Sequence, residues 1–136
     1  ALAAIFLSPH EVPVISPSQV YTWDCELPVQ KPNAITLTCG DGGMYVDHID
    51  WSRWDAKGAK GRGVYSVNDC DPSCADGTFL HVTVSVTLVD LEQFKGKHFF
   101  RMLVIRTNDG KNLPMLDSDN YEWDIMEFAS KSGNLN

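Results

Sequence analysis

HVTVSVTLV, residues 81–89, is the stretch that decides the fold of this chain. Valine or leucine occupies every second position from Val82 to Leu88, and the positions between them are polar. Because successive side chains of a strand point to opposite faces, this period of two predicts a strand with one face on a core and the other toward solvent.

Other β-rich segments follow at intervals of about ten residues, which is typical of sandwiches and barrels. We expect strands at residues 20–23, 34–39, 44–54, 63–67, 99–107 and 121–128, the last of which is alternatively a short helix. The strand at residues 44–54 should contain an irregularity before Ile49. The strand at residues 99–107 should be central, because it is apolar on both faces apart from Arg101 and Arg106. Residues 90–94 should form one helical turn. The predicted fold class is therefore all-β: an antiparallel β-sandwich of about seven short strands or, alternatively, a small closed barrel.

A single β domain is expected for residues 1–136, since no linker or repeat interrupts them. Five of the seven prolines fall within residues 1–34, and proline removes a backbone donor from helices and central strands alike. Residues 1–24 are thus predicted to be a proline-rich arm with edge strands at 12–15 and 20–23, and residues 117–136 an acidic C-terminal segment.

The net charge of −7 works against binding of nucleic acids and anionic membranes, because both are negatively charged. No stretch approaches the roughly 20 apolar residues of a transmembrane helix. The apolar start, residues 1–7, is too short for a signal peptide and lacks its basic flank. We therefore expect a mature chain from which a signal peptide has been removed, secreted or held at the cell envelope as a monomer.

The four cysteines, an even number in a small domain, predict two disulfides and an oxidising compartment. We favour Cys25–Cys39 and Cys70–Cys74 because each pair closes a local loop around a turn. Two alternatives stay open. An immunoglobulin-like arrangement would pair Cys25 with Cys74 around Trp51, leaving Cys39 and Cys70 to pair with each other. A zinc site would use all four thiolates, although the spacing between Cys25 and Cys39 is too long for a ligand pair.

Two tryptophans three positions apart, Trp51 and Trp54, precede a run of basic residues. On a regular strand they would face opposite ways, so we expect Trp51, in register with Ile49, to lie in the core and Trp54 to be exposed. Trp54, Arg53 and Lys57 are accordingly the candidate ligand-binding residues, with the ring of Trp54 stacking on a sugar or a protein partner. The alternative is that both rings simply cover the sheet.

Asp69, Asp71 and Asp76 surround the second cysteine pair and form a weak calcium candidate. Asp69-x-Asp71-x-Ser73 matches the start of an oxygen-rich calcium loop, but the glycine expected at its sixth position and the acid expected at its twelfth are missing. Aspartate is also a common turn former, so we predict a structural turn without a bound metal or cofactor.

No motif of nucleophilic, metal-dependent or phosphate-binding catalysis is present in the sequence. We therefore expect a binding module rather than an enzyme, with a protein or a glycan as partner. The alternative from another class is a small secreted hydrolase that uses Asp41, Asp69 or Asp71, and a purely structural envelope protein is a third. Acids gathered in a cleft would favour the enzyme, whereas a flat face with exposed aromatic side chains would favour the binding module.

Three segments of the chain resemble a known group of proteins. They are LTCGDGG at residues 37–43, IDWSRW at 49–54 and GRGVYSVNDCDPSCADG at 61–77. Over residues 25–107 the chain is similar to small exported proteins of actinobacteria, mycobacteria among them, and NDCxPxCA is the most specific element. This resemblance implies disulfides and secretion, in some members with a lipid anchor. It implies no activity and supplies no catalytic residues.

Overall fold

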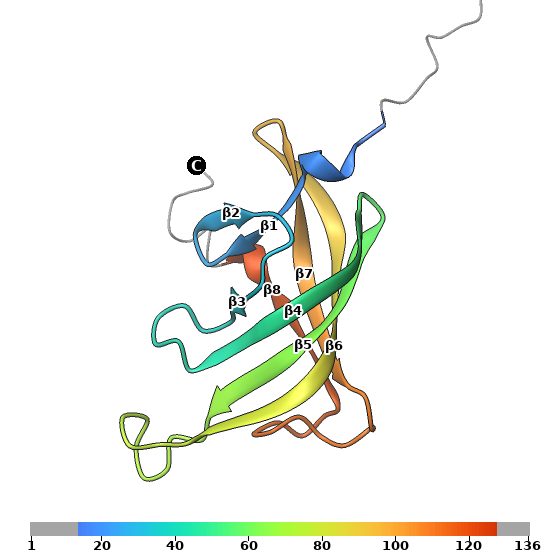
Figure 1. The fold of residues 1–136 in the computed structure, drawn as a ribbon. Helices are drawn as coiled ribbons and strands as arrows, with labels where there is room; N and C mark the ends of the chain where they lie inside the picture. Colours follow the sequence, from blue (N-terminus) through green and yellow to red (C-terminus); the bar gives the residue numbers. More distant parts are fainter. Residues whose placement is uncertain (1–13, 128–136) are drawn as a thin grey trace, which may run out of the picture.

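A computed structural model of the chain describes residues 14–127, which form one sheet curled into half a barrel (Figure 1). A 3-10 turn, η3 (Pro17–Gln19), leads into eight strands. These are β1 (Val20–Asp24), β2 (Leu27–Val29), β3 (Ile35–Thr36), β4 (Met44–Asp55), β5 (Gly58–Asn68), β6 (Phe79–Phe94), β7 (Lys97–Thr107) and β8 (Asn120–Asp124). Their order is β2-β1-β7-β6-β5-β4-β3, and β8 also pairs with β7.

The all-β prediction is confirmed, and a single curled sheet lies closer to the barrel alternative than to a two-sheet sandwich. The sheet is mixed rather than purely antiparallel, because β1 runs parallel to β7 where Val20 lies opposite His98. β7 is central as expected: it pairs with β6, β1 and β8.

Two local predictions are wrong. Residues 90–94 do not form a helical turn, since β6 continues in register with β7 as far as Phe94 opposite Lys97. β1 is not an edge strand, because it lies between β2 and β7; the proline on an edge is Pro28 in β2. The expected strand at 12–15 falls partly outside the described residues, and residues 14–15 are not in a strand. β8 ends at Asp124, after which residues 125–127 are helical and the rest of the acidic segment lies outside the described residues.

β4 carries two bulges, of which the sequence predicted only the first. The register against β5 shifts between Asp47 and Asp50, and again between Trp51 and Arg53. Each inserted residue reverses the alternation of side chains between the two faces. The bulged backbone passes close to β5, where a Cβ on Gly61 would lie 2.5 Å from the carbonyl oxygen of Asp50, so only glycine fits at that position.

The main core fills the concave side of the sheet. Five of its largest fully buried side chains belong to β5, β6 and β7: Tyr65, Leu88, Phe100, Leu103 and Ile105. A second, smaller cluster of Trp23, Phe99 and Met126 is separate from it. Since Phe99 and Phe100 are successive residues of β7 and belong to different clusters, the second cluster lies on the opposite, outer face of this strand.

Both favoured disulfides are confirmed, so the immunoglobulin-like pairing and the four-thiolate zinc site are wrong. Cys25–Cys39 joins the segment after β1 to the segment after β3, two strands from opposite sides of the sheet order. Beside it, the carboxylate of Asp24 accepts the backbone N–H of Thr36 at 2.9 Å. The first disulfide therefore closes the curl of the sheet, and two disulfides are typical of an oxidising, extracytoplasmic environment.

Candidate functional site

Trp54, the first candidate ligand-binding residue, is buried, so the expectation that it is exposed is wrong. Its side chain is 6% exposed, its indole N–H donates to the carbonyl oxygen of Val20 at 3.0 Å, and its ring meets Phe100 edge-on at 5.7 Å. Trp51 is the more exposed of the pair, and the two rings are in T-shaped contact at 5.1 Å. The second bulge explains the error, because the residue inserted at Ser52 turns Trp51 and Trp54 to the same face.

Arg53 and Lys57 lie on the surface and do not converge on Trp54. The guanidinium of Arg53 donates to the Asp55 carboxylate at 2.9 Å, which also accepts the backbone N–H of Lys57 at 2.8 Å. The hydrogen bond from Arg53 is the main reason why the pKa of Asp55 is lowered, and it raises the pKa of Arg53 in turn. The sequence-predicted trio is therefore one core ring and two surface cations.

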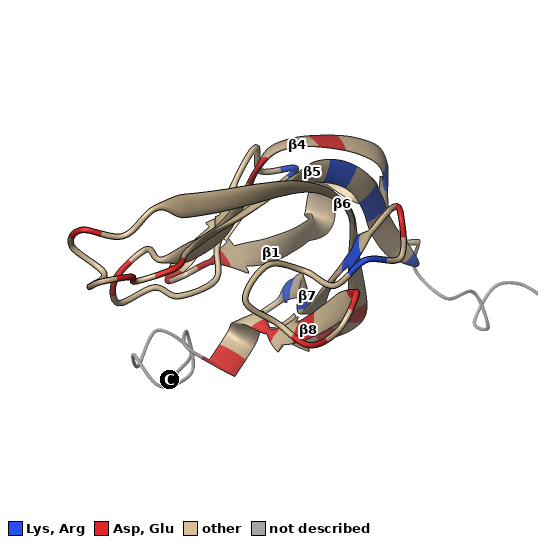
Figure 2. Cartoon of the chain, turned by 90° about the horizontal axis from the view of Figure 1, so that it is seen from below, with Lys and Arg blue, Asp and Glu red and all other residues tan. Residues whose placement is uncertain are grey.

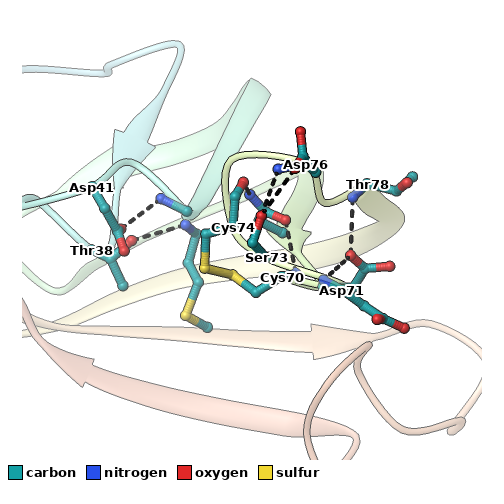
Figure 3. Close-up of a disulfide and its surroundings, with 12 residues drawn as sticks. Thr38, Asp41, Cys70, Asp71, Ser73, Cys74, Asp76 and Thr78 are labelled. Carbon is teal, nitrogen blue, oxygen red and sulfur yellow. Dashed lines mark hydrogen bonds between the residues drawn. A yellow bond between two sulfur atoms is a disulfide. The ribbon is translucent and has the colours of Figure 1, made fainter.

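Two of the three aspartates of the calcium candidate accept hydrogen bonds from their own loop, in which a disulfide joins Cys70 to Cys74 (Figure 3). Asp69 accepts the backbone N–H groups of Asp71 at 3.1 Å and Thr78 at 2.9 Å, while Asp76 accepts a hydrogen bond from the Ser73 hydroxyl at 3.4 Å. Among residues 14–127 no group of three or more His, Cys, Asp or Glu side chains is placed to hold a metal ion. The arrangement is that of a disulfide-bridged turn.

The acids of the alternative hydrolase do not form a catalytic pair either. Asp41 sits in the turn before β4, where the backbone N–H of Gly43 donates to its carboxylate at 2.9 Å and lowers its pKa. A general acid would need the opposite shift, toward neutral pH. Five hollows on the described surface, at Trp54, Cys25, Trp23, Arg53 and Trp51, are not lined by any of the three candidate aspartates.

One contact has the geometry of a nucleophile and its base: the hydroxyl of Ser66 lies 2.6 Å from Nδ1 of His81. The two residues face each other across β5 and β6. Ser66 is buried, however, with only 1% of its surface exposed. This pair satisfies a buried hydroxyl and does not present it to a substrate.

An aromatic hollow, which we call the Trp23 hollow, lies on the outer face of β7. Its floor is the stack of Trp23 on Phe99, with ring centroids 4.5 Å apart and planes 9° from parallel. Its volume is about 170 Å³, and its walls come from the β6–β7 hairpin and from β2: Pro28, Phe94, Lys95 and Lys97.

Two lysines and a tryptophan with an unpaired donor line this hollow. The ammonium group of Lys97 lies 5.2 Å from the ring of Tyr21, and that of Lys95 lies 5.3 Å from Phe94, both within the range of cation–π contacts. Trp23 is 4% exposed, and its indole N–H has no acceptor within the described structure. A buried donor left without an acceptor costs about 1–3 kcal/mol.

Only an indirect signal for the Trp23 hollow is present in the sequence. The apolar character of both faces of residues 99–107 predicted that the outer face of this strand is covered, but not by what. The cover comes from β1 through the parallel pairing of Tyr21 with Phe99, a contact between segments almost 80 residues apart that no local pattern encodes.

Comparison with known protein families, with curated proteins and with solved structures finds no match for this chain. Within residues 14–127 no helix has the length and apolar character needed to span a membrane.

Proposed function

We propose that this protein is an exported binding module of the cell envelope or extracellular space that holds a protein partner at the Trp23 hollow and performs no catalysis. The observation that carries the proposal is the apolar hollow lined by Trp23, Phe94 and Phe99 and flanked by Lys95 and Lys97. The two disulfides support an extracytoplasmic location.

The chemistry of the hollow specifies what it would bind. Phe94 and Phe99 offer apolar contact, and Lys95 and Lys97 offer positive charge. A carboxylate next to an apolar side chain satisfies both requirements. An acidic segment of a partner protein therefore fits this site, in a molecule whose net charge of −7 otherwise repels acidic partners.

Nuclear magnetic resonance tests this proposal directly, since the chain contains four tryptophans and Trp23→Phe identifies the indole signal of Trp23. The probe is the acetylated and amidated peptide Glu-Phe-Glu-Phe-Glu, with Lys-Phe-Lys-Phe-Lys as its charge-reversed counterpart. We expect the acidic peptide to shift the Trp23 indole N–H signal and the basic peptide to leave it unchanged.

Matched charge variants locate the interaction. Lys97→Glu should weaken binding of the acidic peptide by about tenfold or more, because a like charge replaces an opposite one, and Lys57→Glu on the distant β4–β5 turn should not. Equal losses in both variants, or a Trp23 signal that no peptide moves, would rule out the hollow as the site. A shift caused only by an oligosaccharide of uronic acids would replace the protein partner with a glycan.

A further inference from the structure

The beginning of β6 is paired on one side only. β5 accompanies β6 from Phe79 to Leu88, but β7 ends at Thr107, opposite Val84 (Figure 1). The backbone groups of residues 79–83 that point away from β5 therefore have no strand partner among the described residues. Such a row of unpaired N–H and C=O groups is a template for an added strand.

The other free edges of the sheet carry features that discourage strand addition. β2 contains Pro28, β3 has two residues, the free part of β4 is bulged and charged, and β8 carries Glu122 and Asp124. Proline, bulges, charges and short length are the usual protection of an edge. Residues 79–83, with the sequence FLHVT, have no proline, no bulge and no carboxylate or amine.

Apolar side chains are exposed along this same edge. Phe79 and Leu80, which are 36% and 37% exposed, point to opposite faces because they are successive residues of a strand. Phe79 is in contact with the ring of Tyr45 at 5.7 Å. An added strand, whose side chains alternate between the two faces, would find an apolar neighbour on each of them.

Acidic residues flank the edge on both sides (Figure 2). The loop before β6 carries Asp69, Asp71 and Asp76, and the loop that follows β7 carries Asp109, Asp117 and Asp119 against a single lysine, Lys111. Within a Debye length of about 8–10 Å such charges favour a positively charged partner.

We propose that residues 79–83 bind an extended segment of a partner protein as an additional strand, and that this segment carries lysine or arginine residues alternating with apolar ones. A second copy of this chain is a poorer occupant. Pairing two such edges would bring the acidic loops of two molecules, each with a net charge of −7, close together. This surface is independent of the Trp23 hollow.

Titration of a labelled peptide tests the proposal. The probe is acetylated and amidated Lys-Val-Lys-Val-Lys-Val, compared with Glu-Val-Glu-Val-Glu-Val and with the basic peptide N-methylated at alternate residues. We expect the basic peptide to bind and to protect the amides of residues 79–83 from hydrogen exchange. The acidic peptide and the N-methylated peptide should each bind more than about tenfold more weakly, because one lacks the charge and the other the backbone donors.

A matched pair of variants separates this edge from general charge effects. Leu80→Lys should weaken the basic peptide by about tenfold or more, whereas Val14→Lys, which adds the same charge at a more exposed apolar position before η3, should not. Equal binding of the N-methylated peptide, or protection at residues other than 79–83, would overturn strand addition. A dimer in sedimentation experiments that Leu80→Lys abolishes would assign the edge to a second copy and overturn the partner proposed here.

Discussion

Tyr65 offers a sharp quantitative test of the core. It lies in the middle of β5 with no exposed surface, its ring centroid is 6.3 Å from that of Trp123, and its hydroxyl has no hydrogen-bond partner within the described residues. Burial raises the pKa of Tyr65 to about 12, with a smaller contribution from Tyr121. Replacing Tyr65 with phenylalanine removes both the unpaired hydroxyl and the ionisable group.

The expected effect differs between neutral and alkaline pH. At neutral pH the variant loses a buried polar group that makes no hydrogen bond, so its free energy of unfolding should be unchanged or higher by about 1 kcal/mol. Above pH 10 the phenol of the unfolded wild-type chain ionises, whereas that of the folded chain resists until about pH 12. The unfolded state then binds fewer protons, so wild-type stability falls by about 3 kcal/mol more than that of the variant across this window.

Urea unfolding followed by tryptophan fluorescence, between pH 7 and the alkaline range, measures both effects. Tyr45→Phe, at a partly exposed position on β4, is the matched control for the loss of a phenol hydroxyl outside the core. A loss of more than about 1 kcal/mol for Tyr65→Phe at pH 7 would show that the hydroxyl does form a hydrogen bond, for instance to buried water. Identical alkaline profiles for wild type and variant would refute the argument from burial.

Three further predictions concern the elements that shape the sheet. Replacing both Cys25 and Cys39 with alanine should lower the free energy of unfolding by about 3 kcal/mol, and replacing both Cys70 and Cys74 should lower it by about 2 kcal/mol. The first loss is larger because the first disulfide closes the longer loop, and thermal unfolding of the two double variants measures the difference. Trp54→Ala should cost about 3–5 kcal/mol in urea unfolding, as expected for a buried ring, and a cost below about 1 kcal/mol would restore the exposed position predicted from sequence. Gly61→Ala should destabilise by about 1–3 kcal/mol, since its Cβ would lie 2.5 Å from the Asp50 carbonyl oxygen; Gly40→Ala, with open space at its Cβ, should be tolerated in the same assay.

The sequence predicted those parts of the fold that depend on local alternation and on short loops. The period of two in residues 81–89 became the middle of β6, and the loops around Cys25–Cys39 and Cys70–Cys74 gave the correct pairing. The bulge at Ser52 has no comparable signal in the sequence, because any residue type can occupy the inserted position. The residue type that the bulge does restrict is on the facing strand, where only glycine fits at position 61. One missed bulge was enough to misplace Trp54, and with it the whole candidate site.

The Trp23 hollow and the free edge of β6 could not be predicted from the sequence. They depend on which strands pair with each other and on the residues at which those strands end. The hollow requires β1 to dock parallel to β7, and the edge exists because β7 stops at Thr107 while β6 begins at Phe79. Neither the parallel pairing nor the mismatch in strand length follows from periodicity. Both are decided by the closure of the sheet, to which the Cys25–Cys39 bridge contributes.

The two proposed surfaces lie at opposite ends of β6, and their charges make them selective in opposite ways. The sixteen residues of this strand span up to roughly 50 Å, so partners at Phe94 and at Phe79 would not collide. The lysines of the hollow favour acidic segments, and the aspartates beside the edge favour basic ones. An unprotected edge strand can pair with the same edge of another copy and so cause aggregation. The aspartates beside this edge oppose such pairing, because the acidic loops of two copies repel each other, but they do not repel a basic strand. An edge that lacks proline, bulge and charge can therefore stay exposed on this molecule, because its protection lies in the neighbouring loops.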